Sequence, residues 1–117
     1  IDYVRLKEET HVEFRSFDNY QKWTEGYVVY PPHLDGLYAA VGLAGEIGEI
    51  CGHVKKYARD GTLDLPHLRL EIGDALWYLA RVATEFGISM GDVVCANMQK
   101  LEDRRIRGVL GGSGDDR

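Results

Sequence analysis

The chain has 117 residues, a length typical of one domain with a modest hydrophobic core. Its composition, 44% hydrophobic and 28% charged, is that of an ordinary globular protein. A net charge of −5 without a basic stripe argues against a nucleic-acid duplex as the partner. No apolar run reaches the roughly 18 residues that a membrane span needs, so we expect no membrane contact.

Cysteine use and the N-terminal sequence bear on the cellular location. Cys51 and Cys95 are too few for a disulfide framework, and both lie within helical apolar patterns. We interpret them as buried free thiols, which favours a reducing, cytoplasmic location. No signal-peptide pattern is present, although the chain begins at Ile1 rather than at a methionine.

The first half of the sequence predicts an arm, a short helix and a long helix. Residues 1–15 have no helical period and predict an extended N-terminal arm. Ser16 is an N-cap candidate for a short helix that ends near Gly26. After a proline-containing loop, a long helix is predicted over residues 34–59, with Gly61 as its stop signal.

The second half predicts two further helices and a tail. Asp64 caps a third helix that ends at Gly87, with a proline in its permitted first turn. Ser89 and Asp92 form a capping-box start for a last helix that runs to about Arg105. The helical domain therefore covers residues 16–107, and residues 108–117, which contain four glycines, predict a flexible C-terminal tail.

Two helices carry more apolar surface than one chain can cover. The long helix has one apolar stripe, and the third helix has a stripe that includes Ile72 and Leu79. A second apolar patch, Leu70, Trp77 and Ala80, stands roughly opposite that stripe. We expect the stripe to pack on the long helix and the patch to form a subunit interface. The predicted fold is all-α, of the four-helix-bundle type and completed by oligomerisation.

The sharpest chemical feature is a pair of acidic pairs, Glu46-x-x-Glu49 and Glu71-x-x-Asp74. Residues three apart project to the same side of a helix, so each pair presents two carboxylates together. No lysine or arginine stands four residues from any of these acids on its own helix. A divalent cation such as Mg²⁺ or Mn²⁺ would offset this charge, whereas the plain alternative is two solvated helix faces.

Together with the residues that flank them, the two acidic pairs make the sequence resemble the MazG-like family of all-α nucleotide pyrophosphohydrolases. The family carries an ExxE pair, a spacer and an ExxD pair, and 21 residues separate Glu49 from Glu71 here. The resemblance extends over about residues 16–117, through the segments Phe17-Asp18-Asn19-Tyr20-Gln21, Leu43-Ala44-Gly45-Glu46, Ile72-Gly73-Asp74-Ala75-Leu76-Trp77-Tyr78-Leu79, Asn97-x-x-Lys100-Leu101-x-x-Arg104 and the glycine-rich ending.

The resemblance implies a reaction: a nucleoside triphosphate and water give a monophosphate and pyrophosphate. It implies that Glu46, Glu49, Glu71 and Asp74 hold Mg²⁺, and that Glu46 or Glu49 accepts the proton of the attacking water. It places six further residues at the substrate, namely Lys100, Arg104, Asn97, Tyr78, Gln21 and Trp23. By the same analogy the protein is a homodimer or homotetramer whose nucleotide pocket takes residues from two subunits.

Other functions compete with this interpretation. A di-iron carboxylate bundle needs Glu-x-x-His, but Ile50 and Asp64 stand three residues before His53 and His67. A non-catalytic helical dimerisation or binding module would explain the two-sided third helix, but not four uncompensated carboxylates. Within the enzyme class, a base-specific dUTP/dCTP or phosphoribosyl-ATP pyrophosphatase is open, because the motifs do not fix base selectivity.

Overall fold

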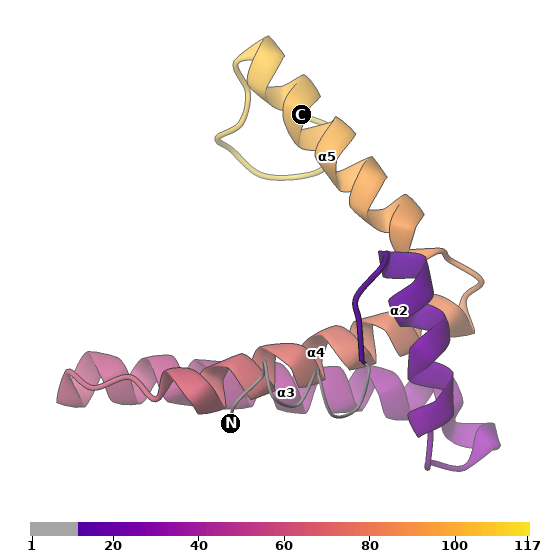
Figure 1. Cartoon of the computed structure of the whole chain (residues 1–117). Helices are drawn as coiled ribbons and strands as arrows, with labels where there is room; N and C mark the ends of the chain where they lie inside the picture. The colour runs from indigo at the N-terminus through magenta and orange to yellow at the C-terminus, as the bar shows by residue number, and fades with distance from the viewer. Residues whose placement is uncertain (1–11) are drawn as a thin grey trace.

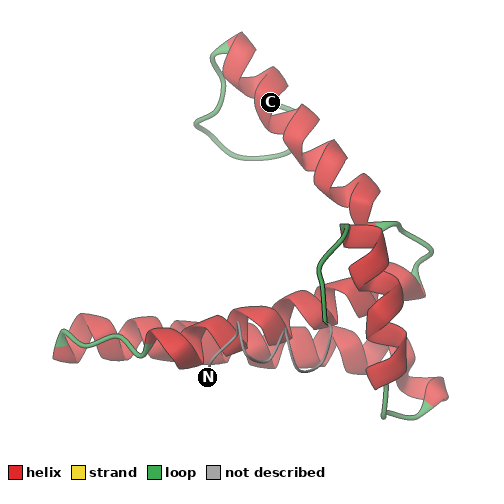
Figure 2. Cartoon of the chain, viewed as in Figure 1, coloured by secondary structure: helices red, strands yellow, loops and turns green. Residues whose placement is uncertain are grey.

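A computed structural model describes residues 12–117, and Figures 1 and 2 show that this part of the chain is built from helices and loops. No strand occurs within the described residues. The predicted all-α fold is confirmed. Its elements are α2 (Phe17–Thr24), the 3-10 turns η1 (Glu25–Tyr27) and η2 (Pro32–Leu34), α3 (Asp35–Asp60), α4 (Leu65–Glu85) and α5 (Met90–Arg107). Most of the predicted arm, residues 1–11, lies outside the described residues.

The helices begin and end at the residues whose chemistry predicted their limits. Ser16, Asp64 and Ser89 are the N-caps of α2, α4 and α5, and each side chain accepts a hydrogen bond from a backbone N–H three residues on. Gly61 ends α3 at φ 76°, a left-handed conformation that suits glycine. Local capping chemistry therefore fixes where the helices start and stop.

The helices do not close into a bundle within one chain. α3 and α4 run antiparallel side by side, α2 crosses them near one end, and α5 points away from the pair (Figure 1). The Cα radius of gyration is 17.0 Å, compared with about 13 Å for a compact domain of about 100 residues. The chain is thus extended for its length, and completion of the bundle by oligomerisation stays a prediction.

The core of the single chain is small and built mostly from small side chains. Ala80, Ala83 and Met90 form its centre where α2, α4 and the start of α5 meet. Large aliphatic residues on the two long helices stay half exposed instead, for example Val54 at 51% and Ile72 at 52%. This leaves much apolar surface on α3 and α4 without a cover from the described part of the chain.

The predicted division of the faces of α4 is wrong. Ala80 is fully buried, and Trp77 packs edge-on against Tyr30 at a ring-centroid distance of 6.2 Å. In contrast, Ile72 and Leu79, which we expected to pack against the long helix, are about half exposed. The reason is that α2 and the loop after it cover the Trp77 side of α4, which the helical period alone does not reveal.

The cysteines also depart from expectation. Cys51 and Cys95 are free thiols as predicted, but both are exposed in this chain. Cys51 lies on α3 at helical spacing from Ile47 and Val54, which are also half exposed. Among residues 12–117, no helix combines the length and the apolar character needed to cross a bilayer.

Candidate metal centre

Three of the four predicted carboxylates converge between α3 and α4. Oxygen atoms of Glu46, Glu71 and Asp74 lie within 4.8 Å of one another. Glu71 and Asp74 share one side of α4 because they stand three residues apart, and the antiparallel packing brings Glu46 of α3 to the same level. Glu49, one turn further along α3, is exposed and lies outside this group of three. We call Glu46, Glu71 and Asp74 the carboxylate cluster.

Glu46 is the most perturbed acid of the cluster. Its Oε2 atom is buried and is the single buried side-chain N or O atom in the described residues without a hydrogen-bond partner. Burial and a hydrogen bond with Glu71, followed by the charges of Asp74, Glu71 and Glu49, raise the pKa of Glu46 to about 7. Near neutral pH this group is therefore held partly protonated by its neighbours.

The rest of the cluster shows the same crowding of negative charge. Burial and the charge of Glu71 raise the pKa of Asp74 above its ordinary value. Within residues 12–117 the basic group paired with the cluster is His53, whose Nε2 stands 3.9 Å from Glu71 Oε1, too far for a hydrogen bond. No permanent cation pairs with the cluster among the contacts of the described residues.

The donor set fits a hard divalent cation. The cluster offers only carboxylate oxygens, one of them buried and without a partner, and their mutual repulsion would be relieved by positive charge. Mg²⁺ and Mn²⁺ prefer such oxygen ligands. Glu46, Glu71 and Asp74 would hold the ion, and Glu49 stands one helical turn from the same site.

An aromatic pocket of about 410 Å³ opens onto the cluster. Two predicted substrate residues, Trp23 and Tyr78, line it, and so do Glu46 and Asp74. Its other large members, Tyr30, Tyr38 and Trp77, together with Tyr27 and Val29, were not among the predicted substrate residues. Tyr38 had a usable signal, since it stands about two helical turns before Glu46 and so on nearly the same side of α3. Tyr30 had none, because it comes from an irregular loop.

Hydrogen bonds from a buried arginine and close ring contacts hold the aromatic walls in place. Arg81 of α4 is 7% exposed and donates hydrogen bonds to Tyr30 Oη (3.4 Å) and Thr24 Oγ1 (3.2 Å). Tyr30 in turn stacks on Tyr38 with ring centroids 4.6 Å apart. The Tyr78 ring lies directly over the backbone of Gly42, where any Cβ would overlap the ring. Gly42 thus permits the close approach of the pocket wall to α3.

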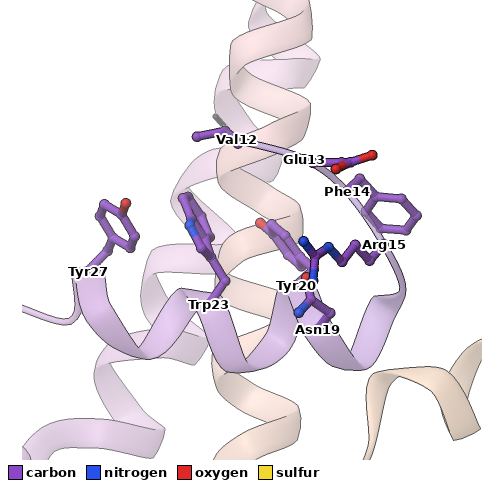
Figure 3. A pocket seen from close by; sticks show the side chains of 8 residues that line it. All are labelled: Val12, Glu13, Phe14, Arg15, Asn19, Tyr20, Trp23 and Tyr27. Carbon is purple, nitrogen blue, oxygen red and sulfur yellow. The ribbon is translucent and has the colours of Figure 1, made fainter. Parts of the chain in front are cut away.

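A second pocket of about 410 Å³ is lined by residues of α2, of η1 and of the segment that precedes α2 (Figure 3). Trp23 and Tyr27 line both pockets, and their ring centroids are 4.3 Å apart. Tyr20 stacks on Trp23 at 5.9 Å and extends the aromatic surface into this second pocket. Arg15 and Asn19 add polar groups at its edge.

The other predicted substrate residues are not brought to the cluster within the chain. Gln21 donates to Thr84 Oγ1 and the Ile88 carbonyl and accepts from the Met90 N–H, so it ties α2 to the turn between α4 and α5. Asn97, Lys100 and Arg104 lie on α5, which points away from α3 and α4. None of these four residues lines the pocket that contains Glu46 and Asp74.

The fold and the site define a class: an all-α protein with a carboxylate cluster between two helices and an aromatic pocket beside it. Residues 38–107 match the MazG nucleotide pyrophosphohydrolase domain, and the chain belongs to this family. The chain is also 38% identical over 111 residues to the Gene 37 protein of Mycobacterium phage L5, covering 86% of this chain and 97% of that protein. No solved structure matches it significantly.

Proposed function

We propose that the protein is a Mg²⁺-dependent nucleoside triphosphate pyrophosphohydrolase that releases a nucleoside monophosphate and pyrophosphate. The carboxylate cluster carries this proposal, because Glu46 keeps a buried, unpartnered oxygen beside two further acids. Family membership supports pyrophosphohydrolase chemistry at the level of the class. Mn²⁺ is the expected substitute for Mg²⁺.

The acids have separate roles in this proposal. Glu46, Glu71 and Asp74 hold the cation, which when bound polarises the phosphates and lowers the pKa of water. Glu49 stands on the same side of α3 but outside the cluster, so it is the better candidate to accept the proton of the attacking water, with Glu46 as the alternative. The water attacks the α-phosphorus, and the bond to the bridging oxygen of pyrophosphate breaks.

The aromatic pocket is the proposed place of the nucleoside. Trp23, Trp77 and the tyrosines offer flat surfaces for stacking with any base, and Tyr78 lines the pocket together with Glu46 and Asp74. Stacking alone is tolerant of base identity. A preference for dUTP, dCTP or phosphoribosyl-ATP would need polar contacts to the base edge.

A second copy of the chain is proposed to complete the site as a homodimer or homotetramer. Aromatic residues, two acids and Val29 line the aromatic pocket, and none of the lining residues within 12–117 is a lysine or arginine. A triphosphate needs cations beyond the metal, and α5 carries Asn97, Lys100 and Arg104 away from its own cluster. Docking of the exposed apolar faces of α3 and α4 onto another copy would bring an α5 to each cluster.

The proposal is tested with a panel of natural and modified nucleoside triphosphates incubated with the protein and Mg²⁺. We expect pyrophosphate release from at least one of them. EDTA should abolish turnover, and excess Mg²⁺ or Mn²⁺ should restore it. Turnover that persists undiminished in EDTA would refute the role of the carboxylate cluster.

A further inference from the structure

The C-terminal segment, residues 108–117, lies beyond the family match, which ends at residue 107. It leaves α5 at Gly108 and folds back along the same helix (Figure 1). Its Asp115 carries the contact of interest: Oδ1 accepts from Lys100 Nζ at 3.1 Å and from Arg104 Nη2 at 3.2 Å. One carboxylate oxygen therefore joins the two cations of α5 that the family resemblance places at the substrate.

The C-terminal segment covers Arg104 more completely than it covers Lys100. The Arg104 side chain is 4% exposed, and it also donates to the Gly114 carbonyl at 3.2 Å. Arg105 and Arg107 pair with acids of α5 itself and are far more exposed, at 62% and 47%. Arg107 also donates to the Arg117 carbonyl at 2.8 Å, but the segment leaves about half of its side chain open. Arg104 is thus the one arginine of α5 that the folded segment encloses, and its known acceptors lie in that segment.

The backbone of the segment is shaped to make these contacts. Gly112 and Gly114 have φ values of 105° and 86°, which other residues rarely adopt. Arg117 donates to the carbonyls of Val109 and Leu110 at 3.3 and 3.2 Å, so the segment is closed on itself. These bonds place Asp115 over Lys100 without relying on a partner molecule.

Lys100 remains open to a ligand. Its side chain is 40% exposed, and an ammonium has three donors, of which Asp115 takes one. The side chain of lysine is long and flexible, so fixing its end reduces the conformational freedom lost when it binds an anion. With Arg104 included, the trio of Lys100, Arg104 and Asp115 keeps one net positive charge.

We propose that Asp115 is a positioning residue for the substrate's phosphates: it fixes the Lys100 ammonium, while Arg104 anchors the segment. This inference rests on the function proposed above, because that function brings Lys100 to a polyphosphate. The segment 108–117 is then part of the substrate site. The opposite possibility is that Asp115 competes with the phosphates for Lys100. Positioning predicts that removal of the Asp115 charge weakens phosphate binding, whereas competition predicts that it strengthens phosphate binding.

The test compares Asp115→Asn with Asp116→Asn, which removes the same charge from the next residue, in the full chain with Mg²⁺. Two quantities are measured: KM and kcat for the best triphosphate, and the affinity for inorganic pyrophosphate by calorimetry. We expect Asp115→Asn to raise KM and the pyrophosphate Kd about fivefold, equivalent to about 1 kcal/mol, with kcat within about twofold. Asp116→Asn should change neither, and Asp115→Glu should restore most of the affinity.

A double-mutant cycle separates positioning from a purely structural role. If Asp115 acts through Lys100, Asp115→Asn should add no further loss in a Lys100→Gln background. An unchanged or lower KM in Asp115→Asn, or its full effect in the Lys100→Gln background, would overturn the inference. The pyrophosphate measurement needs no turnover. A loss of pyrophosphate affinity confined to Asp115→Asn would therefore support positioning even if the wild type hydrolysed no triphosphate. That lack of hydrolysis would refute the proposed function alone.

Discussion

Glu46 is the residue at which the electrostatics of the site are most unusual. Its pKa of about 7 results from burial and from three neighbouring acids, and no lysine or arginine of residues 12–117 is ion-paired with it. The ExxE and ExxD spacing predicted that acids would gather, because helical geometry is regular. It did not predict that Glu49 would stay outside the cluster, because which acid turns inward depends on how α3 is rotated against α4.

The raised pKa of Glu46 predicts how the stability of the metal-free protein depends on pH. The folded state retains a proton that the unfolded state, with an ordinary pKa of 4.5, has already released. The free energy of unfolding should therefore fall as pH rises from about 4.5 to about 7, and Asp74 contributes with the same sign. Thermal melts in EDTA between about pH 4.5 and pH 7 measure this fall in stability.

Glu46→Gln is the matched variant for that pH series. Because its amide does not titrate, the fall in melting temperature should be smaller than in the wild type. Saturating Mg²⁺ should also flatten the wild-type series, since the cation takes the place of the proton. Equal slopes in both proteins would mean that Glu46 does not carry the effect.

Asp74→Asn tests whether the cluster serves catalysis rather than folding. We expect activity to fall by about 100-fold or more, the scale seen when one group that stabilises transition-state charge is removed. The melting temperature in EDTA should stay equal or rise, because one like charge leaves the cluster. Asp116→Asn is the control. A clear loss of metal-free stability would instead make Asp74 a structural residue.

At the scale of the helices, their limits were predictable, whereas the faces they present were partly not. Ser16, Asp64 and Ser89 act through neighbours in sequence, so their caps could be read directly. The faces of α4 depend on α2 and on the loop with Tyr30, which are distant in sequence. Periodicity therefore located the apolar surfaces of α4 but assigned them to the wrong neighbours.

The glycines of α3 give a prediction that separates helix stability from the shape of the pocket. Gly42→Ala should push the Tyr78 ring off α3 and raise KM for the triphosphate, because a Cβ there overlaps the ring. Gly48→Ala is the control, since nothing lies within 4 Å of the Cβ position. It should raise the free energy of unfolding by about 0.5–1 kcal/mol without affecting KM.

Steady-state kinetics and chemical denaturation of both variants measure these effects. The site is expected to lose affinity only in Gly42→Ala. If the two glycines behaved alike in KM, the contact between Tyr78 and α3 would have no part in binding the substrate.

At the scale of the whole molecule, the open faces of α3 and α4 make assembly the central structural question. Leu79 is 45% exposed and Phe86 is 70% exposed. Both follow Ile72 at intervals of seven residues. Spacing of seven residues keeps such side chains on one side of a helix. The sequence predicted an excess of apolar surface, and the structure moves the expected contact from the Trp77 side to the Ile72–Leu79 side.

Leu79→Glu should break the proposed oligomer. A charge without a partner in an apolar contact is costly, so we expect monomers or aggregation, with activity lost although Leu79 is not in the carboxylate cluster. Thr62→Glu, in the exposed turn between α3 and α4, should leave assembly unchanged. Light scattering that found the wild type to be an active 13.2 kDa monomer would contradict the prediction.

The position of the bond that breaks tests the proposed reaction most directly. Hydrolysis of a preferred triphosphate in ¹⁸O-labelled water with Mg²⁺, followed by mass spectrometry, identifies both the products and the phosphorus that is attacked. We predict a nucleoside monophosphate that carries the label and unlabelled pyrophosphate. A nucleoside diphosphate with labelled orthophosphate as the initial products would contradict the proposal that this protein cleaves between the α and β phosphates.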